Sequence, residues 1–210
     1  MAATIRIEVD VYLVTVRVEA YRIVEEQVRV GRGHQIRRVR RAVVDDLVPG
    51  YSRQDISRAF QAVNQIFTLA DIQFGVRSLD AQRVRAPGNR AVVNEEGFVF
   101  LTSRFPSRGA VSLLLVKDFE SRETGGQAIE ERGVCIVKKL SATGFVNVLA
   151  HELGHLLALP HVEPGNADAN YNLMYPALRA GNRLTAEQIQ RARQSPLGTN
   201  PARTPVVREP

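Results

Sequence analysis

Apolar and polar residues alternate through residues 1–48, as they do in β-strands. Over residues 4–19 the apolar positions change from odd to even numbers, so we expect one long strand with a bulge or bend near Leu13. Residues 21–44 alternate on both sides of Gly31-Arg32-Gly33-His34, which predicts a β-hairpin. Pro49 and Gly50 end the pattern, and residues 1–48 are therefore interpreted as an N-terminal β-rich segment.

Residues 49–194 mix helical and strand patterns and are interpreted as the main domain. Apolar residues recur at helical spacing after Ser52, and Ser52 with Asp55 predicts a capping box at the start of that helix. A strongly apolar helix is predicted at residues 145–157, and Thr185 with Gln188 predicts the cap of a last helix. Strands are predicted at residues 72–76, 92–101, 111–116 and 134–137, with surface loops at residues 81–90 and 120–132.

The composition is that of a globular chain. Of the 210 residues 44% are hydrophobic and 24% charged, which allows a packed core, and the single Cys135 allows no internal disulfide. Arg6, Glu8 and Asp10 interrupt the apolar residues at the N-terminus, so no signal peptide is visible. No apolar stretch is long enough to span a membrane, and we expect a soluble protein that is cytoplasmic or exported by a non-classical route. Residues 195–210 carry four prolines and are predicted to form a disordered tail.

The formal net charge is +6, and all but three of the 28 basic residues are arginines. One local cluster stands out, formed by Arg29, Arg32, Arg37, Arg38, Arg40 and Arg41. Such a cluster can bind an anionic polymer such as nucleic acid, although charge runs more often coat a solvated face. Nucleic acid is therefore the less favoured of the expected partners.

The segment from His151 to His161 carries the candidate chemistry. His151 and His155 are four residues apart, and this spacing places both rings on one face of a helix. Both can therefore offer a ring nitrogen to one zinc ion at about 2.0–2.1 Å. Pro160 does not favour continuation of the helix, so the chain turns and His161 can provide a third ligand.

Glu152 follows the first of these histidines and is the candidate general base. Its place on the helix lets the carboxylate reach a water on the metal without becoming a ligand. Zinc lowers the pKa of such a water toward ~7, and Glu152 takes its proton as the water attacks a carbonyl group. Asp168 is a rival third ligand, but His161 fits the spacing better. Three of the four histidines lie within this one segment, which argues against three unrelated structural histidines.

The segment His151–His161 resembles the metzincin clan of zinc metallopeptidases, whose motif is His-Glu-x-x-His-x-x-Gly-x-x-His followed by a Met-turn. Leu173-Met174-Tyr175-Pro176 resembles the matrixin form of that turn, in which Met174 would lie beneath the three histidines as an apolar floor. Residues 63–74 resemble the first helix and the following strand of the clan. The resemblance covers residues 51–194 and leaves the first fifty residues unmatched.

This resemblance implies an α+β, zincin-like fold. It comprises a twisted five-stranded mixed sheet with one antiparallel edge strand, an active-site helix and a C-terminal helix. The implied function is that of a zinc-dependent endopeptidase with one catalytic zinc ion and a peptide or protein substrate. In this clan an edge strand binds the peptide, and residues 111–116 resemble it, with Ser112, Leu113 and Leu114 as substrate-binding residues. The wall of the specificity pocket is expected just after the Met-turn, at Ala177 and Leu178.

Two positions depart from the pattern of the clan. Ala158 stands where glycine is usual, and a left-handed backbone at that position costs an alanine about 1–2 kcal/mol. Pro176 stands where some relatives have a tyrosine that acts as an extra ligand, so a site of three histidines and a water is implied.

Two alternatives stay open. The first is a metallopeptidase that acts at nucleic acid and docks through the arginine cluster at residues 29–41, for which a salt-dependent affinity for DNA would be evidence. The second is a catalytically silent, zinc-stabilised binding module. The presence of Glu152 argues against this module, because a structural zinc site needs no base and usually has a fourth protein ligand.

Overall fold

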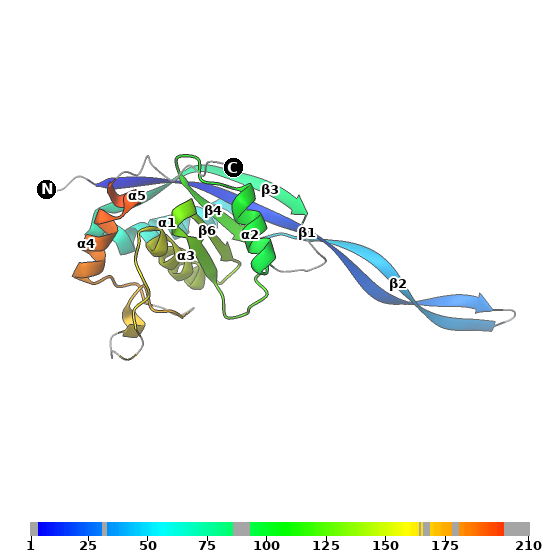
Figure 1. The fold of residues 1–210 in the computed structure, drawn as a ribbon. Helices are drawn as coiled ribbons and strands as arrows, with labels where there is room; N and C mark the ends of the chain where they lie inside the picture. The colour runs from blue at the N-terminus through cyan, green and yellow to red at the C-terminus, as the bar shows by residue number, and fades with distance from the viewer. Residues whose placement is uncertain are drawn as a thin grey trace.

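The computed structural model describes residues 4–30, 33–85, 93–163, 165, 169–177 and 181–199 of the chain, and Figure 1 shows its ribbon. The strands are β1 (Ile5–Val30), β2 (Gly33–Leu47), β3 (Ile72–Arg85), β4 (Val111–Val116), β5 (Gly126–Ile129) and β6 (Val134–Lys138). The helices are α1 (Arg53–Phe67), α2 (Glu95–Arg104), α3 (Ala142–Leu156), α4 (Ala186–Gln194) and α5 (Pro196–Thr199). Short 3-10 helices are η1 (Thr68–Ala70), η2 (Glu130–Arg132) and η3 (Ala169–Tyr171).

The body of the molecule is built on a twisted mixed sheet. Its strands lie in the order β3-β1-β4-β6-β5, with all neighbours parallel except the edge strand β5, which is antiparallel to β6. Helices α1 and α3 pack on one face of this sheet, and α2 packs on the other. The α+β fold class with an antiparallel edge strand is therefore confirmed. The sheet has six strands, one more than expected, because β2 also pairs with β1.

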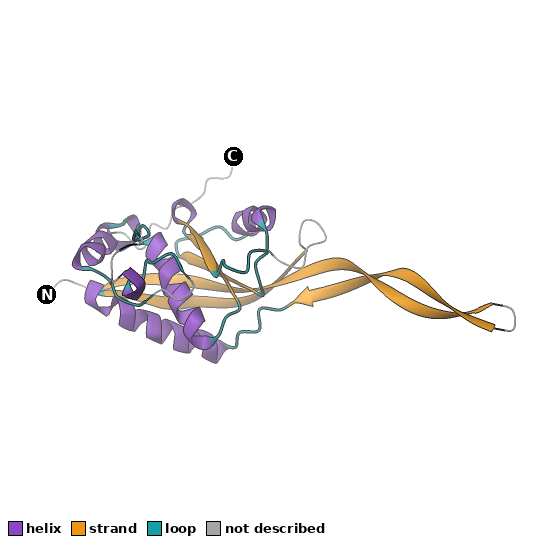
Figure 2. Cartoon of the chain, turned by 90° about the horizontal axis from the view of Figure 1, so that it is seen from below, coloured by secondary structure: helices purple, strands orange, loops and turns teal. Residues whose placement is uncertain are grey.

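Strand β1 belongs both to the body and to a projecting arm. Its residues 5–17 pair with β3 and residues 9–13 with β4, whereas residues 16–30 pair with β2 in antiparallel register. We call residues 18–30 and 33–45 the arm, and Figures 1 and 2 show it extending away from the body. The predicted hairpin is confirmed, although its turn, residues 31–32, lies outside the described residues. The segment 1–48 thus shares one sheet with residues 49–194.

The apolar residues of β1 change parity because both faces of the sheet are covered. Val9 and Val11 pack in the core formed with α1 and α3, whereas Val14 and Val16 pack in the core formed with α2. A strand that is buried on both faces needs apolar residues at both parities. The bulge expected near Leu13 is therefore wrong, and the pairing with β3 continues past that residue without a shift.

The irregularity lies instead on β3. Val9 pairs with Val76 and Asp10 with Ser78, so Arg77 is the extra residue of a β-bulge. Arg77 Nε donates to Asp10 Oδ1 at 2.9 Å, its Nη2 donates to Oδ2, and Ser78 Oγ donates to Oδ1 at 2.8 Å. Burial by itself would raise the pKa of Asp10, but the hydrogen bonds from Arg77 and Ser78 hold it below its ordinary value.

The strand predicted at residues 92–101 is wrong, because α2 occupies most of that segment. The side chain of Asn94 accepts a hydrogen bond from the Gly97 N–H at 2.9 Å and so caps the helix, and two glutamates follow in the first turn. Phe98 and Leu101 lie three residues apart and pack in the core under this helix. The Asn cap followed by acidic residues was the sequence signal for a helix.

Three segments expected to be irregular contain regular structure. Strand β3 continues to Arg85, and β5 with η2 lies inside the loop predicted at residues 120–132. The disordered tail predicted from residue 195 is wrong for its first residues, which form α5. Leu197 is buried in the main core, and Ser195 Oγ accepts a hydrogen bond from the Gly198 N–H at 3.0 Å. Residues 200–210 lie outside the described residues.

Both predicted capping boxes are confirmed. In α1 the reciprocal hydrogen bonds join Ser52 and Asp55, and in α4 they join Thr185 and Gln188. The apolar helix predicted at residues 145–157 is also confirmed and begins three residues earlier, where Ser141 caps α3. Within the described part of the chain, no helix combines the length and the apolar character needed to cross a membrane.

Helix α3 ends in a left-handed turn at Ala158. The Leu159 N–H donates to Gly154 O at 3.1 Å and the Ala158 N–H donates to His155 O at 2.9 Å, which are the two hydrogen bonds of a Schellman motif. Ala158 has φ of 61°, a conformation in which its Cβ approaches the following carbonyl. The structure therefore places Ala158 in the left-handed conformation for which the sequence predicted a cost in free energy.

Replacement of Ala158 by glycine is expected to stabilise the fold. Relief of the left-handed strain outweighs the extra entropy of an unfolded glycine, and the free energy of unfolding should rise by about 1 kcal/mol. Urea denaturation followed by circular dichroism measures the change. Ala150→Gly, in the interior of the same helix, is the matched control and should lower stability by about 1 kcal/mol. A loss of stability in Ala158→Gly would contradict the assigned strain.

Asp10→Asn is expected to destabilise the protein at pH 7 by about 1–3 kcal/mol, because the bidentate hydrogen bond from Arg77 is lost in a buried place. Since the folded pKa of Asp10 lies below its unfolded value, its stabilisation is fully present above the unfolded pKa and disappears as the pH falls through the folded pKa. Urea midpoints of wild type and variant between pH 7 and pH 3 should therefore converge toward acid. A constant difference over this range would rule out the carboxylate as its source.

Candidate active site

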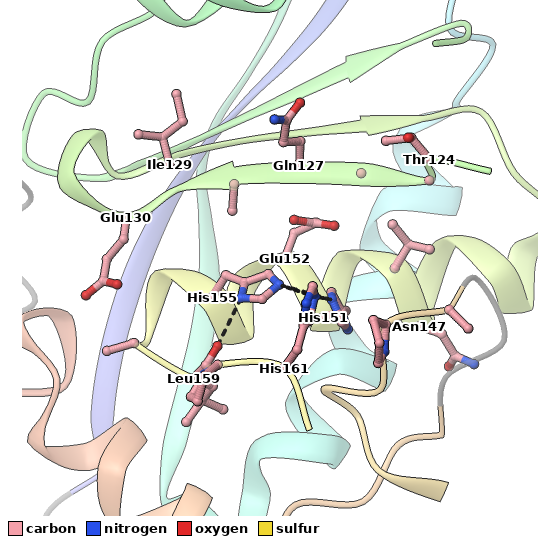
Figure 3. A pocket seen from close by; sticks show the side chains of 18 of the residues that line it. Thr124, Gln127, Ile129, Glu130, Asn147, His151, Glu152, His155, Leu159 and His161 are labelled. Carbon is pink, nitrogen blue, oxygen red and sulfur yellow. Dashed lines mark hydrogen bonds between the residues drawn. The ribbon is translucent and has the colours of Figure 1, made fainter. Parts of the chain in front are cut away.

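A cleft of about 640 Å³ lies between the edge strand β5 and helix α3. Residues of β5 form one wall, and α3 contributes the side chains of one of its faces (Figure 3). The opposite side is closed by residues 158–161, which follow α3, and by Pro176 and Ala177. Every residue of the predicted zinc motif that carries a polar side chain lines this cleft.

Three histidines meet at one point in the cleft. Helix α3 supplies His151 and His155, and the turn at Ala158 reverses the chain so that His161 returns to the same place. The three Nε2 atoms form a triangle in which each separation is 3.1 Å. In a tetrahedral zinc site with bonds of 2.0–2.1 Å the ligand nitrogens lie about 3.3 Å apart. The triangle therefore has the size that a single zinc ion requires.

Backbone carbonyls fix the proton positions of two of these rings. His151 Nδ1 lies 2.7 Å from Leu173 O, and His155 Nδ1 lies 2.9 Å from Leu159 O. A carbonyl oxygen only accepts, so Nδ1 carries the proton in both rings. In the neutral rings both Nε2 atoms then face each other with lone pairs and cannot hydrogen-bond to each other. A cation among the three nitrogens satisfies them, so the donor set fits a metal ion.

The cleft keeps the two helical histidines in their neutral, metal-binding form. Burial lowers the pKa of His155 to about 4, and the neighbouring His151 and His161 act in the same direction. Burial also lowers the pKa of His151. Both rings are therefore uncharged at neutral pH, as metal ligation requires.

Glu152 points away from the three rings toward β5 (Figure 3). Its side chain is buried, and this burial raises its pKa to about 8, whereas a divalent cation close by would lower it again. A Cβ atom on Gly126 of β5 would lie 2.6 Å from Glu152 Cγ and 2.7 Å from its Oε1. Gly126 thus leaves the room that this carboxylate occupies beside the edge strand. The sequence analysis did not single out Gly126.

The Leu173 carbonyl that orients His151 belongs to a turn held by helix α4. Asn172 and Gln188 exchange side-chain hydrogen bonds of 2.9 and 3.1 Å, and Asn172 Oδ1 also accepts from the Met174 N–H at 2.8 Å. Gln188 is at the same time the capping-box residue of α4. The capping-box residue predicted from the sequence, Gln188, therefore also supports the candidate metal ligand His151 through Leu173.

Met174 is fully buried against the helix that carries the histidines. A Cβ atom on Gly154 of that helix would lie 2.6 Å from Met174 Sδ, so the glycine allows the two segments to approach closely. The Met174 carbonyl accepts a hydrogen bond from the Val162 N–H at 3.0 Å, one residue after the third histidine. Met174 thus packs beneath the end of α3 and beside the segment of His161.

A second contact from α4 supports the turn between the ligands. Arg191 Nε donates to Ala158 O at 2.7 Å, and Arg191 itself lines the cleft. The contact joins α4 to the left-handed residue that redirects the chain from His155 to His161. No pattern in the sequence indicated this role, because it depends on the packing of two segments that lie far apart in the chain.

The substrate-binding residues predicted in residues 111–116 are not at an edge. Strand β4 pairs with β1 on one side and β6 on the other, so its backbone has no free edge for a peptide. Ser112, Leu113 and Leu114 are buried and line no part of the cleft. The edge strand beside the cleft is β5, whose four residues all line it. Strand β5 is short and lies within a segment rich in polar residues and glycine, so its sequence shows no strand periodicity.

The other predicted site residues fall into two groups. Ala177 lines the cleft, next to Pro176. Leu178 and the rival ligand Asp168 lie outside the described residues. The cleft is also lined by Thr124 and Asn147, which the sequence analysis did not include. Asn147 lies one helical turn before His151, so its spacing in the sequence was the signal that could have found it.

No protein-family model and no curated protein sequence matches this chain. The fold is nevertheless similar to solved structures of zinc metallopeptidases. Metalloproteinase-II from Bacteroides fragilis matches with a TM-score of 0.53 and 16% identity over 92% of this chain, which spans only 54% of the length of that protein. Archaemetzincin from Methanopyrus kandleri matches with a TM-score of 0.52 and 12% identity, over 90% of this chain and 94% of that one.

A zinc-dependent peptidase from Methanocorpusculum labreanum also matches, with a TM-score of 0.46 and 14% identity over 66% of this chain and 93% of that one. The first two similarities establish the fold: a mixed α+β architecture on a twisted open sheet, shared with zincin-like metallopeptidases. Among the described residues, His151, His155 and His161 form a group that could hold a metal ion.

Proposed function

We propose that this protein is a zinc-dependent endopeptidase of the metzincin type. The observation that carries the proposal is the triangle of three Nε2 atoms, 3.1 Å apart, beside a buried glutamate in an open cleft. His151, His155 and His161 would hold a zinc ion, which would supply Lewis-acid chemistry to polarise the peptide carbonyl and acidify a water. Two structures with a similar fold are named metalloproteinase-II and archaemetzincin, which supports this proposal.

Glu152 is proposed to move the proton. As general base its carboxylate accepts a proton from the attacking water, and as general acid it passes that proton to the leaving amine nitrogen. Gly126 leaves the carboxylate its place beside β5, where a bound peptide would run. Burial excludes bulk water from the carboxylate, so the proton stays with the reacting atoms.

The substrate is proposed to bind as an additional strand on the free edge of β5. Backbone groups of this edge provide hydrogen bonds that do not depend on the substrate sequence, while the cleft selects side chains. Residues 123–131 line the cleft along the whole strand and beyond both its ends. A peptide can therefore continue in both directions, which supports cleavage of internal bonds. Ala177 would form part of the wall of the specificity pocket, and Met174 the apolar floor beneath the histidines.

An open coordination position distinguishes this proposal from a silent zinc module. Among the described residues, the three histidines are the group of side chains whose ligand atoms lie within 4.8 Å of one another, and no Cys, Asp or Glu joins them. A structural zinc site has four protein ligands, whereas a catalytic one has three and an open position. The donor count therefore favours catalysis.

Purified protein is expected to bind one zinc ion, and 1,10-phenanthroline should abolish peptide hydrolysis. His161→Ala should weaken zinc binding at least about 10²-fold, since even outer-shell changes cost 10–100-fold. Competition with a chromophoric chelator measures the affinity. Asp168→Ala is the control and should bind zinc like the wild type. Loss of zinc in Asp168→Ala with retention in His161→Ala would show that the third ligand is misassigned.

Glu152→Gln is expected to keep the fold and the zinc content but to lower kcat by at least about 10²–10⁴-fold, because the base is removed while the ligands remain. Turnover of a quenched fluorescent peptide measures the loss. Glu131→Gln is the matched control, since it neutralises an exposed carboxylate of the same cleft and should keep most of the activity. Near-normal turnover of Glu152→Gln would contradict the mechanism.

A further inference from the structure

The arm contributes no residue to the lining of the cleft. Beyond residue 17, β1 pairs with β2 alone, and the two strands leave the body as a twisted ribbon (Figure 2). Its 13 residue pairs, from Val18↔Asp45 to Val30↔Gly33, span roughly 43 Å at 3.3 Å per residue. An isolated two-stranded ribbon is marginally stable in water, so a ribbon of this length gains stability from a partner.

The net charge of the protein is concentrated in the outer part of this ribbon. We call residues 22–30 and 33–41, from the Arg22↔Arg41 pair to the Val30↔Gly33 pair, the distal arm. It carries six arginines and two glutamates, a net charge of +4, and the rest of the chain therefore contributes +2 to the total of +6. The arm as a whole is closer to neutral, because Glu19 and Asp45 lie near its base.

The strand register sets arginines against one another. Arg22 lies directly opposite Arg41, and a like-charge pair at opposed positions destabilises a sheet unless an anion lies nearby. Both glutamates have arginines opposite them, and the Arg38 Nε to Glu25 Oε1 distance is 3.0 Å. Arg29 faces His34 and Arg40 faces Ile23, so these positions add positive charge with no acidic residue opposite. The distal arm is thus built with an excess of cations along its length.

The shape and composition of the distal arm select among anionic partners. It contains no Phe, Tyr or Trp, whereas stacking on single strands and insertion into a membrane interface both rely on these residues. A two-stranded β-ribbon fits the major groove of B-form DNA, which is about 12 Å wide. The nine residue pairs of the distal arm span roughly 30 Å, close to one helical turn of about 34 Å, with phosphates on either side.

We propose that the distal arm binds duplex DNA in the major groove through arginine–phosphate contacts. The arm then holds the protein on DNA while the cleft, between β5 and α3, stays free for a protein substrate. Phosphate contacts carry no base sequence, so binding is expected to be strong at low salt and largely independent of sequence. The inference does not rest on the proposed peptidase function, since it uses no residue of the cleft.

The test is fluorescence anisotropy with a labelled 30-base-pair duplex, using the full-length protein. A variant with Arg22, Arg29, Arg40 and Arg41 replaced by glutamine is compared with a control in which Arg53, Arg58, Arg104 and Arg122, exposed on the body, are replaced in the same way. The expected plot of log affinity against log salt has a slope of about −4 or steeper for wild type, since each phosphate contact contributes about −0.9. The arm variant should lose about 3–4 of this slope, and the body control should match the wild type.

Three results would overturn the proposal. One is the absence of duplex binding by the wild type at 50 mM salt. The second is equal loss of affinity in the arm variant and the body control, which would mean that charge anywhere on the surface suffices. The third is displacement of the duplex by polyglutamate, or by a single strand of equal length, at the same concentration of charge, which would point to an acidic polypeptide or an unstacked strand as the partner. Circular dichroism of both variants checks that the fold is retained.

Discussion

Three imidazole Nε2 atoms lie 3.1 Å apart, and much of the surrounding structure serves to hold them there. Helix α3 provides two rings on one face, and the turn at Ala158 returns the chain so that the third joins them. Carbonyls of Leu159 and Leu173 fix the proton positions of the helical pair. The two helical histidines then face each other with lone pairs, and a metal ion held by the three residues would satisfy them.

Helix α4 is part of this support, although none of its residues belongs to the group of three histidines. Through Gln188 it holds Asn172 in the turn that carries Leu173, and through Arg191 it holds the carbonyl of Ala158. Both ends of the ligand set are thus tied to one helix that is packed in the main core. The left-handed alanine stores strain at the point where the chain must reverse, and the hydrogen bond from Arg191 acts on that same residue.

Local signals made much of this predictable from the sequence. The spacing of His151, Glu152 and His155 on a helix, the turn forced near Pro160 and the two capping boxes each depend on neighbouring residues, and the structure has them where they were expected. The choice of edge strand failed because it depends on sheet order. An apolar run such as β4 has the same sequence pattern whether the strand lies at an edge or in the middle of a sheet. Strand β5 has only four residues within a polar loop, which are too few to show a period. Residues 92–101 predict a strand by their apolar pattern alone, whereas the cap at Asn94 indicates the helix α2.

The long strand β1 shows a further limit of periodicity. Its apolar residues occupy both parities because two cores cover the two faces of the sheet, and the same pattern had been interpreted as a bend. Periodicity also does not indicate which part of β1 belongs to the body and which to the arm. That division depends on the pairing partners β2, β3 and β4, which are separated from β1 by different lengths of chain. In the structure, β1 is both a strand of the central sheet and one of the two strands of the arm.

The central claim is that three neutral histidines hold zinc and leave one position open. X-ray absorption at the zinc edge of the purified, zinc-loaded protein tests it most directly, because the fine structure reports the number and type of ligand atoms. The account predicts three imidazole nitrogens and one non-protein oxygen at about 2.0–2.1 Å. A sulfur ligand at about 2.3 Å, or a shell closed by a fourth protein ligand, would contradict it.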